Sequence, residues 1–128
     1  MEPFWLDRDL LLALYDDIVE ASGGARGVRD EGLLASALNR PANRFHYDGC
    51  RDLLELAATY ATAISGNHPF IDGNKRVAFV AMGQFLEDNG LRIVADDDDA
   101  TDIMFAVASG EADLEALVSW LRQVVLAG

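Results

Sequence analysis

The sequence predicts an all-α protein, a compact six-helix bundle around one buried central helix. Apolar residues recur at helical spacing in six segments, the connections between these segments are short, and no segment shows the regular alternation of half-buried strands. With 128 residues, 51% of them apolar, the chain can build the core of one domain spanning residues 1–128. No linker composition interrupts it, so no domain boundary is expected.

The first two helices are predicted from caps and breakers. The first begins after Asp7, which serves as N-cap, and ends before a pair of glycines. The second is shorter, from about Gly32 to Asn39, with Asp30 as its cap. Pro41 is expected to stop it, because proline lacks a backbone N–H and clashes with the preceding turn. Residues 40–50 are therefore predicted to form a loop.

The third and fourth helices form the centre of the predicted bundle. The third carries one continuous apolar face, made of Leu53, Leu56, Ala57, Tyr60, Ala61 and Ile64. The fourth runs from near Gly73 to Asn89, and Gly90 follows as a left-handed stop. Between Val77 and Leu86 only Gln84 is polar, so this helix is expected to be buried on most sides.

The C-terminal third predicts a short strand and two more helices. Leu91–Val94 reads as a strand whose only obvious partner is Phe4–Leu6, so a small hairpin-like pairing of these segments is expected. Asp96–Asp99 lead into a fifth helix that ends at Gly110. A sixth helix carries the apolar residues Leu114, Leu117, Val118, Leu121, Val124 and Val125.

Composition narrows the functional classes. The net charge of −12 disfavours direct nucleic-acid binding, which needs clustered lysines and arginines. Such a surface suits a basic protein partner, and keeping the protein soluble explains the charge equally well. No apolar run approaches the ~18 residues of a membrane span, and the N-terminus lacks a secretory pattern. With Cys50 as the sole cysteine, a cytoplasmic protein without membrane contact is expected.

The loop between the third and fourth helices, residues 66–76, has features of an anion site. It opens the buried helix, whose free N–H groups and positive dipole end favour a negative ligand. Gly73 has no side chain, so the backbone there can approach a phosphate closely. Asn74 adds neutral donors, and Lys75 and Arg76 add positive charge.

Two further side chains of this loop add acid–base chemistry. One of His68 and Asp72 can accept a proton, and the other can contact a metal or a hydroxyl group. Phe70 is expected to be a buried anchor. An anion cradle, cations, a base and a carboxylate are what phosphoryl or nucleotidyl transfer requires. A structural histidine, an N-cap at Asp72 and a solvated helix face explain the same residues, and the residues alone leave both interpretations equally open.

The segment His68–Arg76 resembles the signature of the Fic/Doc superfamily, which reads His, any residue, Phe, any residue, Asp or Asn, Ala or Gly, Asn, Lys-Arg. Lys75 and Phe79 stand where adenylylating Fic enzymes usually have a glycine and a second arginine, and both departures match the death-on-curing (Doc) branch. The likeness to Doc toxins covers nearly the whole chain, including Gly27–Leu34, Ala58–Tyr60, Leu86–Gly90 and Ala108–Glu111.

This resemblance implies a toxin of a toxin–antitoxin system that moves the γ-phosphate of ATP, with Mg²⁺, to a hydroxyl group of elongation factor Tu and so halts translation. It implies His68 as the base and Asp72 as the Mg²⁺ ligand or the group that orients the hydroxyl. It also implies a phosphate cradle made by Gly73, Asn74, Lys75 and Arg76. The alternatives are a Fic-type adenylyltransferase and an inactive binding module that acts through its antitoxin.

The resemblance also bears on regulation and docking. Self-inhibited Fic proteins carry a Ser or Thr with Glu four positions later, and this chain has no such pair. Inhibition is therefore expected from a second protein, a Phd-type antitoxin. Residues 40–49 would fold over the end of the third helix as a flap, with Arg44 and Tyr47 as contacts to the protein substrate.

Overall fold

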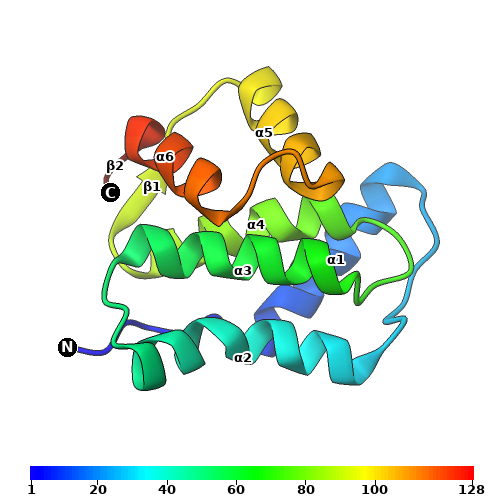
Figure 1. Ribbon diagram of the computed structural model, residues 1–128. Helices are drawn as coiled ribbons and strands as arrows, with labels where there is room; N and C mark the ends of the chain where they lie inside the picture. The colour runs from blue at the N-terminus through cyan, green and yellow to red at the C-terminus, as the bar shows by residue number, and fades with distance from the viewer.

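Two antiparallel helices, α3 (Leu53–Asn67) and α4 (Asn74–Asp88), form the centre of the structure, and four others pack around them (Figure 1). The computed structural model describes all residues from 1 to 128. Helix α2 lies along one side of α3, α5 and α6 cover the other side, and α1 packs against α4. The remaining elements are α1 (Arg8–Ser22), α2 (Glu31–Asp48), β1 (Leu91–Ile93), α5 (Asp97–Ser109), α6 (Leu114–Val124) and β2 (Val125–Ala127). The predicted all-α class is confirmed.

The buried residues form one core cluster to which all six helices contribute. The inner face of α4 is completely buried at Val77, Ala81 and Phe85, so the prediction of a buried central helix is confirmed. Helix α3 is buried just as deeply, because its alanines let neighbouring helices approach closely. No helix is both long enough and apolar enough to traverse a lipid bilayer.

Helix ends follow the signals in the sequence. The side chains of Asp7 and Asp30 accept hydrogen bonds from backbone N–H groups in the first turns of α1 and α2, as predicted. Gly90 and Gly110, both with φ of 84°, adopt the left-handed conformation expected after α4 and α5.

Helix α2 continues through Pro41 to Asp48, so the predicted end near Asn39 and the loop at residues 40–50 are wrong. Pro41 is buried, together with Ala37 and Phe45, on the face that packs against the core. These positions are spaced by four residues and share one side of the helix. Burial of that side offsets the cost of about 3 kcal/mol for an internal proline.

The short strand after α4 exists, but its expected partner was wrong. Strand β1 pairs antiparallel with β2, in the register Leu91 with Ala127 and Ile93 with Val125. The expected partner, Phe4–Leu6, has its backbone bonded elsewhere. The side chain of Asn89 bonds both the N–H and the carbonyl of Phe4, and the hydroxyl of Tyr60 accepts from the N–H of Leu6. Helix α6 brings the C-terminal end of the chain beside β1 instead.

Candidate functional site

The loop between α3 and α4 is anchored to α1 by a pair of stacked aromatic rings. Phe70 is fully buried, as predicted, and its ring stacks on that of Tyr15 in α1, with centroids 4.1 Å apart and planes at 17°. The hydroxyl of Tyr15 accepts from the N–H of Gly27 at 2.9 Å and donates to the Gly27 carbonyl at 3.2 Å. Tyr15 therefore joins α1, the loop and the segment after α1.

The side chain of Asn74 fixes the shape of the loop by pairing with the backbone of Phe70. Its side-chain oxygen accepts from the N–H of Phe70 and its amide donates to the Phe70 carbonyl, both at 2.9 Å. Helix α4 begins after Gly73, whose φ is 81°, and no side chain caps it. The backbone N–H groups of Asn74, Lys75 and Arg76 donate to no acceptor within the chain. Three free donors at the positive end of a helix form a ready anion site.

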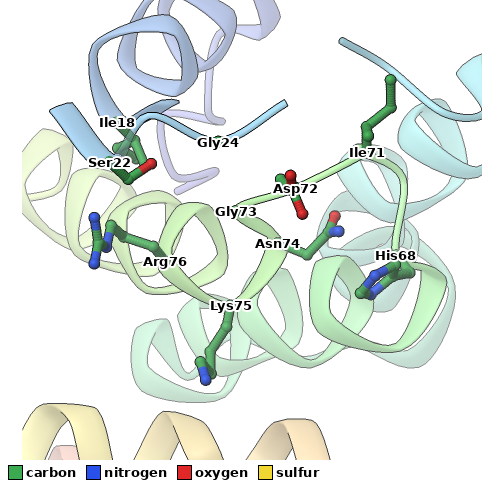
Figure 2. Close-up of a pocket in the computed structure, with 10 residues that line it drawn as sticks. All are labelled: Ile18, Ser22, Gly24, His68, Ile71, Asp72, Gly73, Asn74, Lys75 and Arg76. Atoms are coloured by element: carbon green, nitrogen blue, oxygen red, sulfur yellow. The ribbon is translucent and has the colours of Figure 1, made fainter. Parts of the chain in front are cut away.

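A cavity of about 500 Å³ opens at this helix start (Figure 2). This volume lies within the range of small-ligand pockets. Its walls come from the loop, the first turn of α4, the last turns of α1 and the segment after α1. The lining residues are Ile18, Ser22, Gly24, His68, Ile71, Asp72, Gly73, Asn74, Lys75 and Arg76. The structure thus brings together at one cavity the motif residues predicted to bind or react with a ligand, His68 and Asp72–Arg76.

His68 ends α3 in an unusual backbone conformation. Its φ of 53° and ψ of 53° are left-handed, and it is the only residue other than glycine with positive φ. This conformation costs an ordinary residue roughly 1–2 kcal/mol. The side chain is exposed, and the imidazole makes no hydrogen bond or ion pair within the chain. The ring is therefore free to contact a ligand in the cavity.

Asp72 lies in the cavity with one oxygen engaged. Its Oδ2 accepts from the backbone N–H of Ala25 at 2.9 Å, and Oδ1 stays free. A Cβ on Gly24 would lie 3.4 Å from the Cβ of Asp72, an ordinary van der Waals contact, so the segment after α1 passes close to this carboxylate. No cluster of three or more His, Cys, Asp or Glu side chains could hold a metal. One free carboxylate oxygen suits Mg²⁺ that arrives with nucleotide phosphates, because Mg²⁺ commonly uses one carboxylate together with them.

Lys75 and Arg76 are two exposed cations without a carboxylate partner. They project to different sides of α4, Arg76 toward the end of α1 and Lys75 away from it (Figure 2). The Nζ of Lys75 lies 4.7 Å from the centre of the Phe105 ring in α5. Both cations also line a second cavity of about 430 Å³ between α4 and α5. Unpaired positive charge at one place on a protein of net charge −12 favours an anionic ligand there.

The segment that joins α1 to α2, residues 24–30, runs beside the loop and is called the brace segment below. Val28 and Phe70 form an isolated antiparallel bridge. The N–H of Ile71 donates to the carbonyl of Gly27 at 3.0 Å. The brace segment therefore holds the loop by backbone pairing, as a neighbouring strand would.

Sequence reasoning missed two residues of this arrangement, Tyr15 and Arg29. Tyr15 lies on the apolar face of α1 and reads as an ordinary core residue. Arg29 donates from its guanidinium to the carbonyls of His68 and Asn67. The only sequence feature that pointed to Arg29 was the resemblance of Gly27–Leu34 to Doc toxins, and this resemblance does not indicate which residues the segment contacts.

Arg44 and Tyr47 are not brought to the cavity. The Nη1 of Arg44 donates to the hydroxyl of Thr59 at 2.8 Å, where α2 packs on α3. Tyr47 is 84% exposed near the C-terminal end of α2, at the opposite end of the bundle from the loop (Figure 1). The expected flap is wrong because residues 40–48 belong to helix α2, which packs along α3. Their contact with a protein substrate stays a prediction.

The family of the chain follows from its sequence relatives. The Fic/DOC family model matches residues 5–86, which include α1, the brace segment, the loop and most of α4. The chain belongs to the Fic/DOC family. Protein kinase doc of Escherichia phage P1 is 32% identical over 114 residues, which cover 89% of this chain and 90% of that protein. Toxin Doc of Mycolicibacterium smegmatis (strain ATCC 700084 / mc(2)155) is 39% identical over 120 residues, 91% of this chain and 90% of that protein.

In this Fic/DOC protein the family match covers the first cavity but not the ring that contacts Lys75. All ten residues that line the first cavity lie within the matched segment. Phe105, which contacts Lys75, lies beyond it in α5. The resemblance to the Doc branch that the sequence indicated is confirmed by the two relatives.

Proposed function

We propose that this protein is a Doc-like toxin that transfers the γ-phosphate of ATP to a hydroxyl group of a protein. One observation carries the proposal: an exposed imidazole without a partner shares a cavity with an uncapped helix start and two unpaired cations. The relative from phage P1 bears the name of a protein kinase, which supports the same class of reaction. Elongation factor Tu is the proposed protein substrate, by resemblance to the Doc branch.

The anion-binding part of the site is the start of α4. A phosphate group there meets the free N–H groups of the first turn together with Lys75 and Arg76. Asn74 contributes its backbone N–H, while its side chain keeps the loop in shape through Phe70. Gly73 leaves the approach open, because no side chain stands before the first turn.

His68 is the proposed general base. Its imidazole takes the proton from the acceptor hydroxyl, whose oxygen then forms a bond to the γ-phosphorus. The bond from that phosphorus to the oxygen bridging it to the β-phosphate breaks, and ADP leaves with the electron pair. Lys75, Arg76 and the backbone donors stabilise the negative charge on the phosphoryl oxygens, which is the main contribution of the protein in phosphoryl transfer.

Asp72 is the proposed contact for Mg²⁺, through its free Oδ1. When bound, Mg²⁺ neutralises negative charge on the phosphates. The hydrogen bond from Ala25 to Oδ2 holds the carboxylate in the cavity and limits its rotation. Asp72 can instead orient the acceptor hydroxyl, and this role needs no change in its position.

Transfer of phosphate rather than AMP is proposed from Phe79 and Lys75. Phe79 lies one turn after Lys75 and Arg76, borders the second cavity with them, and has no hydrogen-bond donor for a phosphate. Lys75 occupies space over the first turn where adenylylating relatives have a glycine. We further propose a Phd-type antitoxin as the inhibitor, since the chain lacks the self-inhibitory pair of Fic proteins.

The test uses purified protein, elongation factor Tu, and ATP labelled in either the α- or the γ-phosphate. We expect label on the factor from γ-labelled ATP alone, and an intact mass that increases by one phosphate. His68→Ala should lower the rate by about 10²–10⁴-fold, the usual contribution of a general base. His46→Ala is the matched control, because His46 lies on α2 beside Glu2 and outside the cavity.

Two results would contradict the proposal. Label from α-labelled ATP, with a mass increase of one AMP, would indicate an adenylyltransferase. Growth arrest that persists in cells expressing His68→Ala would indicate a binding module whose toxicity does not depend on chemistry at this loop.

A further inference from the structure

We propose that Arg29 is a positioning residue that holds His68 in its left-handed conformation and so aims the imidazole into the cavity. The functional part of this inference rests on the proposed role of His68 as general base. Arg29 lies in the brace segment, 39 residues before His68, and no feature of the motif itself points to it.

The contacts of Arg29 fall on the backbone at His68 and on both sides of it. Its Nε donates to the carbonyl of His68 at 2.8 Å, and its Nη2 donates to the carbonyl of Asn67 at 3.0 Å. The backbone N–H groups of Arg29 and Asp30 donate to the carbonyl of Pro69 at 2.7 and 3.1 Å. Three successive carbonyls are therefore held by one short stretch of the brace segment.

This stretch of backbone needs external support for two reasons. The last carbonyls of a helix have no partner within the helix, and α3 ends here. His68 also adopts a positive φ, which residues other than glycine keep only when their surroundings impose it. A guanidinium can satisfy two neighbouring carbonyls at once, because its donors form a rigid planar fork.

Arg29 acts through His68 and not on the ligand. It does not line the cavity at the start of α4, whereas Lys75 and Arg76 do. Its Nε and Nη2 are already engaged by the loop carbonyls. Loss of the side chain would leave the bonds from the brace backbone to Pro69 in place, so the expected effect is local to the turn at His68.

The experiment compares Arg29→Ala and Arg29→Lys with Arg26→Ala. Arg26 is the matched control, because it is an exposed arginine of the same brace segment without a hydrogen bond or ion pair. In the phosphotransfer assay we expect Arg29→Ala to lower kcat by about tenfold to a hundredfold, the usual effect of a small misplacement of a catalytic group. The KM for ATP should not change. Arg29→Lys should be intermediate, because an ammonium is a point donor without the fork.

Two further readouts separate positioning from general destabilisation. Millimolar methylguanidinium should restore activity to Arg29→Ala and leave Arg26→Ala unchanged. In nuclear magnetic resonance spectra, the amide and imidazole signals of His68 should shift in Arg29→Ala, return toward their wild-type positions with methylguanidinium, and stay in place in Arg26→Ala.

Several results would overturn the inference. Arg29→Ala with the kinetics of Arg26→Ala would show that the guanidinium is dispensable. A raised KM for ATP at unchanged kcat would place Arg29 on the nucleotide instead. Unshifted His68 signals in Arg29→Ala would show that the guanidinium does not hold the backbone at His68. If the wild-type protein transfers no phosphate, the proposed function fails, and the spectra still decide whether Arg29 holds His68.

Discussion

The side-chain amide of Asn74 is paired with both backbone groups of Phe70, at 2.9 Å in each direction. Both residues are buried, and Asn74 is 4% exposed. The loop therefore has its shape before any ligand arrives. A preformed loop leaves the helix N–H groups aimed at the cavity, which is the arrangement that electrostatic catalysis requires.

We expect Asn74→Ala to destabilise the protein strongly. The substitution leaves the N–H and the carbonyl of Phe70 without partners in a buried place, at a cost of about 1–3 kcal/mol for each group. Urea denaturation measures the free energy of unfolding, with Asn43→Ala on the exposed side of α2 as the control. An equal effect of the two substitutions would mean that the pair with Phe70 contributes little.

We expect Phe105 to assist Lys75 in nucleotide binding. The Nζ of Lys75 lies 4.7 Å from the ring centre, and a cation–π contact at an exposed site is worth about 0.5–1 kcal/mol. Phe105→Ala should therefore raise the KM for ATP about two- to fivefold. Phe105→Leu, which keeps apolar bulk without a ring face, should show a similar rise. Wild-type kinetics in the leucine variant would show that bulk alone matters.

Stability should fall in acid partly through Asp52, which caps α3 and pairs with Arg122 of α6. Burial alone would raise the pKa of Asp52, but hydrogen bonds from Arg122 and from the Leu54 N–H outweigh it and lower that pKa below 3.8. The unfolded chain therefore takes up this proton first as pH falls. The stabilisation is complete above the unfolded pKa and is lost as pH falls through the lower folded value.

The substitution Asp52→Asn isolates this charge, because the amide oxygen can still cap α3. We expect thermal melting of the variant to depend less on pH than melting of the wild type below about pH 4. Asp17→Asn, on the exposed side of α1, serves as the control. Parallel melting curves for Asp52→Asn and the wild type across this range would contradict the assignment.

Tyr60 should destabilise the fold when it ionises. Burial raises its pKa from 10.0 to about 12, against a lowering effect of the hydrogen bond from the Leu6 N–H, and Asp88 adds to the rise. Because the folded pKa is the higher one, the stabilisation is complete below the unfolded pKa and is lost as pH rises through the folded one. The free energy of unfolding should therefore decline from pH 10 toward about 12.

The variant Tyr60→Phe tests both properties of this hydroxyl. It leaves the buried N–H of Leu6 without an acceptor, so at neutral pH we expect a loss of about 1–3 kcal/mol in the free energy of unfolding. Its stability should then be less sensitive to alkaline pH, and the tyrosinate absorbance step near pH 12 should disappear. Persistence of that step would assign it to another tyrosine.

Two predictions, the end of α2 and the partner of β1, were wrong because they used rules that consider only neighbouring residues. Pro41 is a helix breaker by local chemistry, yet α2 passes through it because Ala37, Pro41 and Phe45 share a face that the core buries. Strand β1 has a recognisable strand sequence, but the partner of so short a strand depends on which segment the packing of the helices places beside it. That segment is β2, because Phe4 and Leu6 are already bonded to side chains of α3 and the end of α4.

The linear chain by itself determined the helix class, most helix ends and the group of polar residues from His68 to Arg76. These depend on spacing, caps and turn residues, whose effects act within one or two turns of the chain. The folded structure decided which distant residues support that group. Tyr15 and Arg29 reach the loop because packing of α1 and the brace segment against it buries apolar surface, and such contacts across many residues leave no periodic trace in a sequence.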